Sequence, residues 1–97
     1  MSRLTVQIGI VRIQGGRYKV EKIKVSEDHG DRVDVANVSL KEQAEFRTKD
    51  EAREHGGQLA HAFITSNHGE GASYQTQWKT RVVIRQEVVE ETVKERQ

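Results

Sequence analysis

Apolar and polar residues alternate strictly at the start of the chain. Every second position from 4 to 10 is apolar: Leu4, Val6, Ile8 and Ile10. This period is typical of a strand with one buried face, so we expect a strand over 3–14. Gly15-Gly16 follows, and glycine reaches the positive φ that tight hairpin turns require. With a return strand over 17–26, the pattern predicts a β-hairpin centred on the two glycines.

An acidic loop over 27–31 separates this hairpin from a third strand, predicted over 32–40. Thr48 then begins a helix, because its hydroxyl can cap the first turn and Glu51 completes a capping box. One face of this helix collects apolar and small residues: Ala52, Gly56, Leu59, Ala60 and Phe63. Since Gly56 lies on that face, we expect either a close approach to the sheet or a break into two short helices.

The remaining residues predict a long flexible loop over 65–77 and a last strand over 78–89. The charged residues 90–97 predict a frayed tail, with a short helix that uses Val89 and Val93 as the alternative. The element order is therefore β-β-β-α-β. It predicts one α+β domain over 1–97, an antiparallel β-meander with one helix packed on one face of the sheet.

The apolar residues of the hairpin change face half-way along it. With Gly15-Gly16 as the turn, the register pairs Ile13 with Tyr18, Val11 with Val20, Ile8 with Ile23, and Val6 with Val25. The first two pairs then lie on one face and the last two on the other. The third strand changes face in the same way, between residues 33–35 and 38–40. Either bulges restore one apolar face, or the hairpin tip offers apolar residues to a partner or to a second copy.

Charge is balanced over the whole chain but not along it. The 97 residues carry a net charge of +1, less than is usual for a nucleic-acid-binding domain. Residues 1–25 contain one acid, Glu21, and six basic residues: Arg3, Arg12, Arg17, Lys19, Lys22 and Lys24. The predicted register places Arg12 opposite Lys19, and like charges destabilise a ladder. Either Asp34 of the third strand or a bound anion such as phosphate would relieve this repulsion.

No motif predicts catalysis or a metal site. The chain has no cysteine, which favours the cytoplasm and excludes thiolate chemistry. His55 and His61 are six residues apart on the helix and point in different directions, and His29 fits a turn between strands. The glycines around Glu70 lack the Lys-Ser/Thr of a phosphate loop. We therefore expect no enzyme, no cofactor, no metal and no membrane partner.

The leading hypothesis is a non-enzymatic interaction protein that binds a protein or a protein–nucleic acid complex. Its contact residues are predicted to be Arg12, Ile13, Arg17, Tyr18, Lys19 and Tyr74. Tyr74 is the expected aromatic anchor, Trp78 is expected to be buried, and the hairpin tip could also form a homodimer. The alternative is a nucleic-acid-binding module that uses Lys22, Lys24, Lys79, Arg81 and Arg85.

In its length and its lack of motifs, the chain resembles the short inhibitors encoded by phages and mobile elements, such as anti-CRISPR proteins. The resemblance concerns only the short length and the absence of recognisable motifs, and it rests on no particular residues. It implies that the protein acts by occluding a surface on a larger complex.

Overall fold

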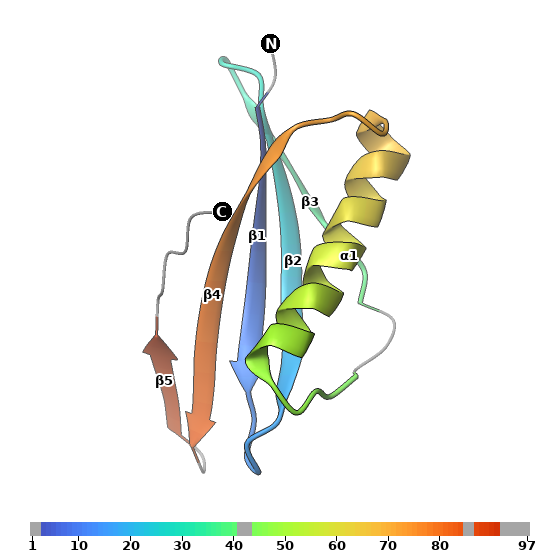
Figure 1. Ribbon diagram of the computed structural model, residues 1–97. Helices are drawn as coiled ribbons and strands as arrows, with labels where there is room; N and C mark the ends of the chain where they lie inside the picture. Colours follow the sequence, from blue (N-terminus) through green and yellow to red (C-terminus); the bar gives the residue numbers. More distant parts are fainter. Residues whose placement is uncertain (1–2, 41–43, 85–86, 92–97) are drawn as a thin grey trace.

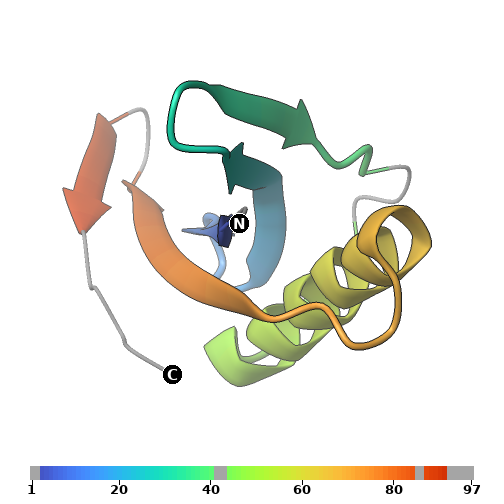
Figure 2. The same cartoon turned by 90° about the horizontal axis from the view of Figure 1, so that it is seen from above.

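The structure, a computed structural model, describes residues 3–40, 44–84 and 87–91. The described strands form one sheet in the order β3-β2-β1-β4-β5, and the helix α1 lies across one face of it (Figure 1). In chain order the elements are β1 (Arg3–Arg12), β2 (Tyr18–Asp28), β3 (Val33–Asn37), α1 (Lys49–His68), β4 (Tyr74–Ile84) and β5 (Glu87–Glu91). The sheet is strongly twisted (Figure 2).

These elements confirm the α+β class and the order β-β-β-α-β, and they correct the fully antiparallel arrangement. β1, β2 and β3 form the expected antiparallel meander, but β4 pairs with β1 in parallel. Parallel strands require a long crossover connection. α1 lies in that connection, which leads from the edge strand β3 to the far side of β1. The sheet is therefore mixed, with β1 at its centre.

The helix begins where the sequence predicts it and ends later. Thr48 is the N-cap, and its Oγ1 accepts a hydrogen bond from the backbone N–H of Glu51 at 3.1 Å. α1 is continuous to His68, and Gly69 caps it with a φ of 92°. The loop predicted over 65–77 is therefore wrong in extent, because residues 65–68 form the polar last turn of the helix.

The last predicted strand is two strands. β4 begins at Tyr74 rather than at residue 78, and β5 pairs with its end in antiparallel fashion. Residues 87–91 are thus a strand rather than the start of a frayed tail or a terminal helix. Residues 92–97 lie outside the described part of the chain.

The β1–β2 hairpin contains a bulge at Glu21. From Arg3 to Gly9 the register follows the prediction and confirms the pairs Ile8–Ile23 and Val6–Val25. Beyond Gly9, the extra residue Glu21 shifts the pairing by one. The predicted pairs Ile13–Tyr18, Val11–Val20 and Arg12–Lys19 are therefore wrong. Their places are taken by Arg12–Tyr18, Val11–Lys19 and Ile10–Val20.

The turn of this hairpin is one residue longer than predicted. The N–H of Ile13 donates to the carbonyl of Arg17 at 2.8 Å, which leaves Gln14, Gly15 and Gly16 as the loop. Both glycines adopt positive φ, 98° and 79°, a conformation that glycine adopts without steric cost. The longer loop and the bulge at Glu21 together account for the apparent change of face.

The bulge returns most of the hairpin's apolar residues to the helix side. Val20 and Ile23 both point toward α1, although regular alternation would put residues three positions apart on opposite faces. Val11 remains on the face opposite the helix. β3 has no bulge. Its Val33 and Val35 point away from the helix and are 57% and 53% exposed. The strand predicted over 32–40 ends at Asn37, and Val38 and Leu40 beyond it pack against the core.

The core lies between α1 and the sheet. Its buried residues are Leu4, Val6, Ile8, Ile10, Ile23, Val25, Ala52, Ala60, Ile64 and Trp78. Trp78 is 6% exposed, as predicted. A Cβ at Gly56 would lie 3.0 Å from Cγ2 of Ile8 and 3.3 Å from Cγ2 of Val20. The close approach predicted at Gly56 is therefore confirmed.

Candidate functional site

The face of the sheet opposite α1 is the candidate site, and we call it the open face. Among the described elements, α1 packs on β1 and β2 from the other side, and no element packs on this one (Figure 2). Alternation along each strand defines its side chains. In β1 to β4 they are the odd-numbered residues of β1, β3 and β4, together with Ile13, Lys19, Glu21 and the even-numbered residues 22–28 of β2.

Basic side chains dominate the open face from β1 to β4. There are two acids, Glu21 and Asp28, against six basic residues: Arg3, Lys19, Lys22, Lys24, Lys79 and Arg81. Within the described residues, Lys22, Lys24 and Lys79 form no ion pair. This face is thus more positive than the net charge of the chain suggests.

Gly9 lies at the centre of this basic surface. It pairs with Lys22 of β2 on one side and with Lys79 of β4 on the other. A Cβ at Gly9 would lie 3.1 Å from Cγ of Lys22, a tight contact, so a side chain at this position would displace the lysine stem from its place over β1. The two lysines therefore flank a strip of β1 that carries no side chain.

The bulge residue Glu21 reaches across β1 to Arg81 of β4. Nε of Arg81 donates to Oε2 of Glu21 at 3.2 Å, and Nη2 donates to Oε1. Such bidentate pairs fix both side chains in place. Beside this pair, Val11 is only 3% exposed although no element covers this face. Glu21 thus neutralises one cation and helps to shield the apolar end of the open face.

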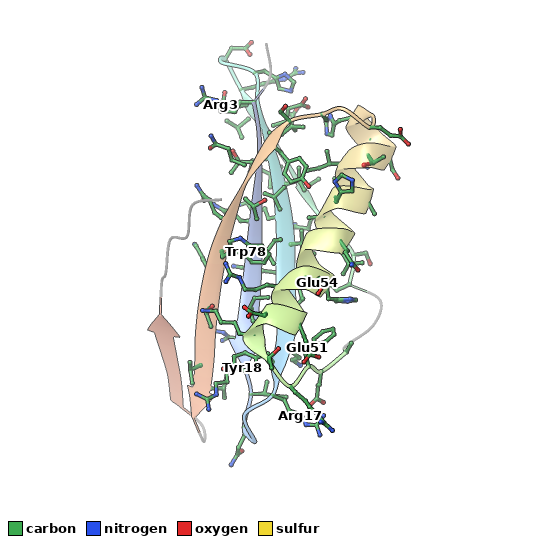
Figure 3. The ribbon with its side chains drawn as sticks, viewed as in Figure 1. Arg3, Arg17, Tyr18, Glu51, Glu54 and Trp78 are labelled. Carbon is green, nitrogen blue, oxygen red and sulfur yellow. The ribbon has the colours of Figure 1, made fainter. Side chains whose placement is uncertain are left out.

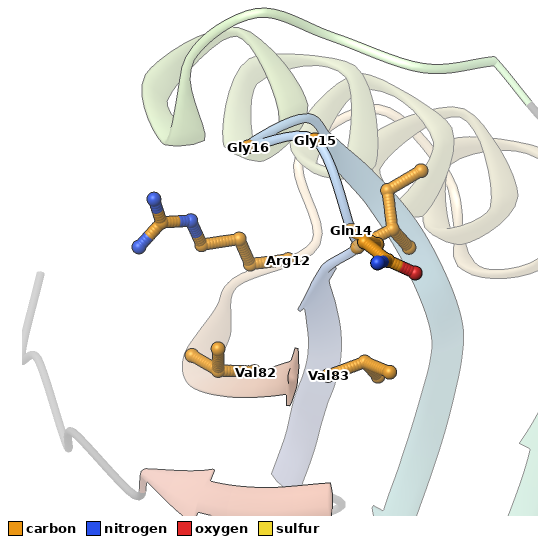
Figure 4. Close-up of a pocket in the computed structure, with 7 residues that line it drawn as sticks. Arg12, Gln14, Gly15, Gly16, Val82 and Val83 are labelled. Atoms are coloured by element: carbon orange, nitrogen blue, oxygen red, sulfur yellow. The ribbon is translucent and has the colours of Figure 1, made fainter. Parts of the chain in front are cut away.

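Two shallow hollows lie near the hairpin loop. One, of about 310 Å³, is lined by Val11, Ile13, Val83 and the Glu21–Arg81 pair, among others. The other, of about 270 Å³, lies between the glycine loop and the end of β4, where Arg12 is the charged lining residue (Figure 4).

The residues predicted to bind a protein partner do not share one surface. Tyr18 packs against the core on the helix side, and the guanidinium of Arg12 lies 5.9 Å from the centre of its ring. Ile13 and Lys19 lie on the open face instead. Arg17 lies next to the glycine loop at the hairpin end, far from Arg3 at the other end of β1 (Figure 3).

Tyr74 is also far from the hairpin tip. It pairs with Leu4 at the opposite end of β1, and it is half-buried against the core. Its hydroxyl lies within hydrogen-bond distance, 3.1 Å, of Nδ1 of His61. The structure therefore separates Tyr74 from the other residues predicted to form this contact.

The residues predicted to bind nucleic acid do come together. Lys22 and Lys24 on β2, and Lys79 and Arg81 on β4, all lie on the open face, on either side of β1. Arg85 lies outside the described residues. The sequence pattern does not predict that β2 and β4 lie on either side of β1, because this arrangement depends on the parallel pairing of β4 with β1.

Aromatic side chains are confined to the helix side of the sheet. The chain has five, and all belong to the core or pack against it: Tyr18, Phe46, Phe63, Tyr74 and Trp78. The open face therefore lacks the stacking platforms of single-strand-binding proteins. It can instead contact anionic groups through ammonium, guanidinium and amide groups.

The turn between β2 and β3, where the sequence predicts only a turn, brings together three candidate metal ligands. Nε2 of His29 lies 3.1 Å from Oε1 of Glu27 and 3.1 Å from Oδ2 of Asp34. The β2–β3 register pairs Glu27 with Asp34. Knowing this register from the sequence would have shown that the two carboxylates lie beside His29.

The two helix histidines singled out in the sequence lie elsewhere on α1. His55 lies beside Phe46, and His61 lies beside Tyr74.

No helix in the described part of the chain is both long and apolar enough to cross a membrane. Comparison with protein-family models finds no match, and neither a curated protein nor a solved structure is significantly similar to the chain.

Proposed function

We propose that the protein is a non-enzymatic binding protein whose open face contacts the phosphate backbone of a nucleic acid. The supporting observation is the set of lysines around Gly9. Lys22, Lys24 and Lys79 lie on neighbouring strands of one uncovered face, without an ion pair among the described residues. Phosphate groups would supply the missing counter-charge, and such contacts provide most of the affinity of non-specific nucleic-acid binding.

This mode of binding recognises charge rather than sequence. Lysine acts as a point charge and does not distinguish bases by itself. The amides of Gln7 and Gln77, which could contact base edges, are hydrogen-bonded to each other at 3.2 Å. Because aromatic side chains lie on the helix side, we expect the protein to bind duplexes without sequence preference. The lack of cysteine fits a cytoplasmic setting.

Titration of labelled duplex DNA at several salt concentrations tests this function. With three or four phosphate contacts, the logarithm of the association constant should fall with the logarithm of salt concentration at a slope of about −3. A duplex of unrelated sequence should behave in the same way. Absent binding at low salt, or binding that salt does not weaken, would contradict the proposal.

A second candidate function is binding to a protein surface, as an inhibitor would do. It is favoured by Val33 and Val35, which are more than half exposed on the open face. Apolar patches of this kind often mark protein contacts. Light scattering of the wild type and of the double variant Val33→Ser/Val35→Ser examines self-association first. A dimer that the variant loses would identify a second copy as the occupant of this patch, and a wild-type monomer would exclude it.

A further inference from the structure

One ring nitrogen at the β2–β3 turn lies between two carboxylates. Nε2 of His29 is 3.1 Å from a carboxylate oxygen of Glu27 and 3.1 Å from one of Asp34. A neutral imidazole nitrogen carries at most one proton, so it cannot make a good hydrogen bond to both. A cation bound by the imidazole and both carboxylates would instead use all three groups as ligands.

The last turn of α1 adds a second histidine. Nδ1 of His68 lies 3.7 Å from the other oxygen of the Glu27 carboxylate, Oε2. Glu27 therefore lies between two imidazoles, one from the turn and one from the helix. The four side chains come from β2, the turn, β3 and α1, and the fold itself assembles them.

The two distances from His29 match the spacing of ligands in a tetrahedral site. With metal–ligand bonds of about 2.0–2.1 Å, neighbouring ligand atoms lie about 3.3 Å apart. His29 is 3.1 Å from each carboxylate, and the ligand atoms of Glu27, His29 and Asp34 all lie within 4.8 Å of one another. His68 lies outside this group of three and is 3.7 Å from Oε2 of Glu27, so its side chain would have to move toward the ion to become the fourth ligand.

We propose that Glu27, His29, Asp34 and His68 bind a divalent transition-metal ion, with Zn²⁺ as the best match. Imidazole nitrogen suits zinc and its neighbours, whereas Mg²⁺ and Ca²⁺ take oxygen ligands. The side chains of Glu27, His29 and His68 are 23%, 28% and 26% exposed, so an ion can reach them from solution.

Arg32 is the competing cation at this position. Its Nε lies 3.7 Å from Oδ2 of Asp34, and its side chain is 68% exposed. An exposed pair of this kind contributes little to stability, so a metal ion can displace Arg32 into solvent. The bound ion would tie the β2–β3 turn to the end of α1, and it should therefore raise the unfolding temperature.

Calorimetric titration of the untagged, chelator-treated protein with ZnCl₂ tests the site. We expect one ion per chain, a higher unfolding temperature with Zn²⁺, and no heat of binding with MgCl₂. His29→Ala and His68→Ala should each weaken Zn²⁺ affinity by at least about tenfold, the loss that even supporting residues outside the coordination shell can cause. His61→Ala is the matched control, since His61 lies on the same helix beside Tyr74, and it should bind as the wild type does.

Circular dichroism of the metal-free variants keeps the test independent of folding, because neither histidine belongs to the core. A wild type that does not bind Zn²⁺ would overturn the proposal. Undiminished binding by a folded His29→Ala variant, or a loss in His61→Ala alone, would overturn it equally.

Discussion

Gly56 and Gly57 are adjacent in α1 but have different surroundings. A Cβ at Gly56 would lie 3.0 Å from Ile8, whereas a Cβ at Gly57 would meet its nearest atom, Cη2 of Trp78, at 3.9 Å. Alanine favours a helix over glycine by about 1 kcal/mol. At Gly56 that gain is opposed by overpacking, which costs about 1–3 kcal/mol.

We therefore expect the same substitution to have different effects at the two positions. Gly57→Ala should stabilise the protein by up to about 1 kcal/mol, and Gly56→Ala should be less stable than Gly57→Ala by at least about 1 kcal/mol. Urea unfolding of the two variants measures this difference. Equal stabilisation by both would show that the helix can move away from Ile8 and Val20 without cost.

At the scale of the element, the bulge in β2 predicts which residue of that strand can be deleted. Removing Glu21 closes the bulge and keeps Val20 and Ile23 on the helix side. The variant loses the ion pair with Arg81, worth up to about 1 kcal/mol. It should fold, with circular dichroism and thermal unfolding close to those of the wild type.

Deletion of Lys24 is the matched control within the same strand. It would move Val25, 3% exposed, to the open face, since a shift of one residue reverses every later side chain. Losing the burial of this side chain costs about 1.5–3 kcal/mol. A Lys24 deletion that is as stable as the Glu21 deletion would contradict the assigned bulge.

Elements with a strong local signal were predictable from the sequence. The alternation from Leu4 to Ile10 gave the face of β1, and Thr48 with Glu51 gave the start of α1. The sequence pattern alone does not distinguish a bulge at Glu21 from a shifted turn, because both move the same apolar residues to the other face. The pattern also does not indicate the end of α1, because its last turn is polar and polar residues there are equally typical of a loop.

The candidate site was only partly predictable. Alternation places Lys22 and Lys24 on one face of β2, and the charge count pointed to this hairpin. Lys79 joins them only because β4 pairs with β1 in parallel, which depends on a crossover of some 35 residues that local pattern does not fix. The ligands at the β2–β3 turn were missed for a similar reason, since Asp34 meets Glu27 through strand register.

The whole molecule is elongated, with principal extents of 44 × 23 × 23 Å. Its basic open face runs along the strands, so the long axis matches about 13 base pairs of duplex at 3.4 Å each. The candidate metal ligands lie at the β2–β3 end, whereas Gly9 and its flanking lysines lie further toward the hairpin loop. We therefore expect Zn²⁺ to change stability with little effect on duplex binding, which a titration with and without the ion would reveal.

Two charge-matched double variants test the role of the open face most directly. Lys22→Ala/Lys79→Ala removes the lysines beside Gly9, and Arg47→Ala/Lys49→Ala removes two cations near the start of α1. Fluorescence anisotropy with labelled duplex DNA, at about 50 and about 200 mM salt, measures affinity and salt slope for each. The first variant should bind more weakly and lose about two units of slope, while the second should retain most of the wild-type affinity. Equal losses in both variants, or a loss in the second alone, would contradict the assignment of the open face as the binding surface.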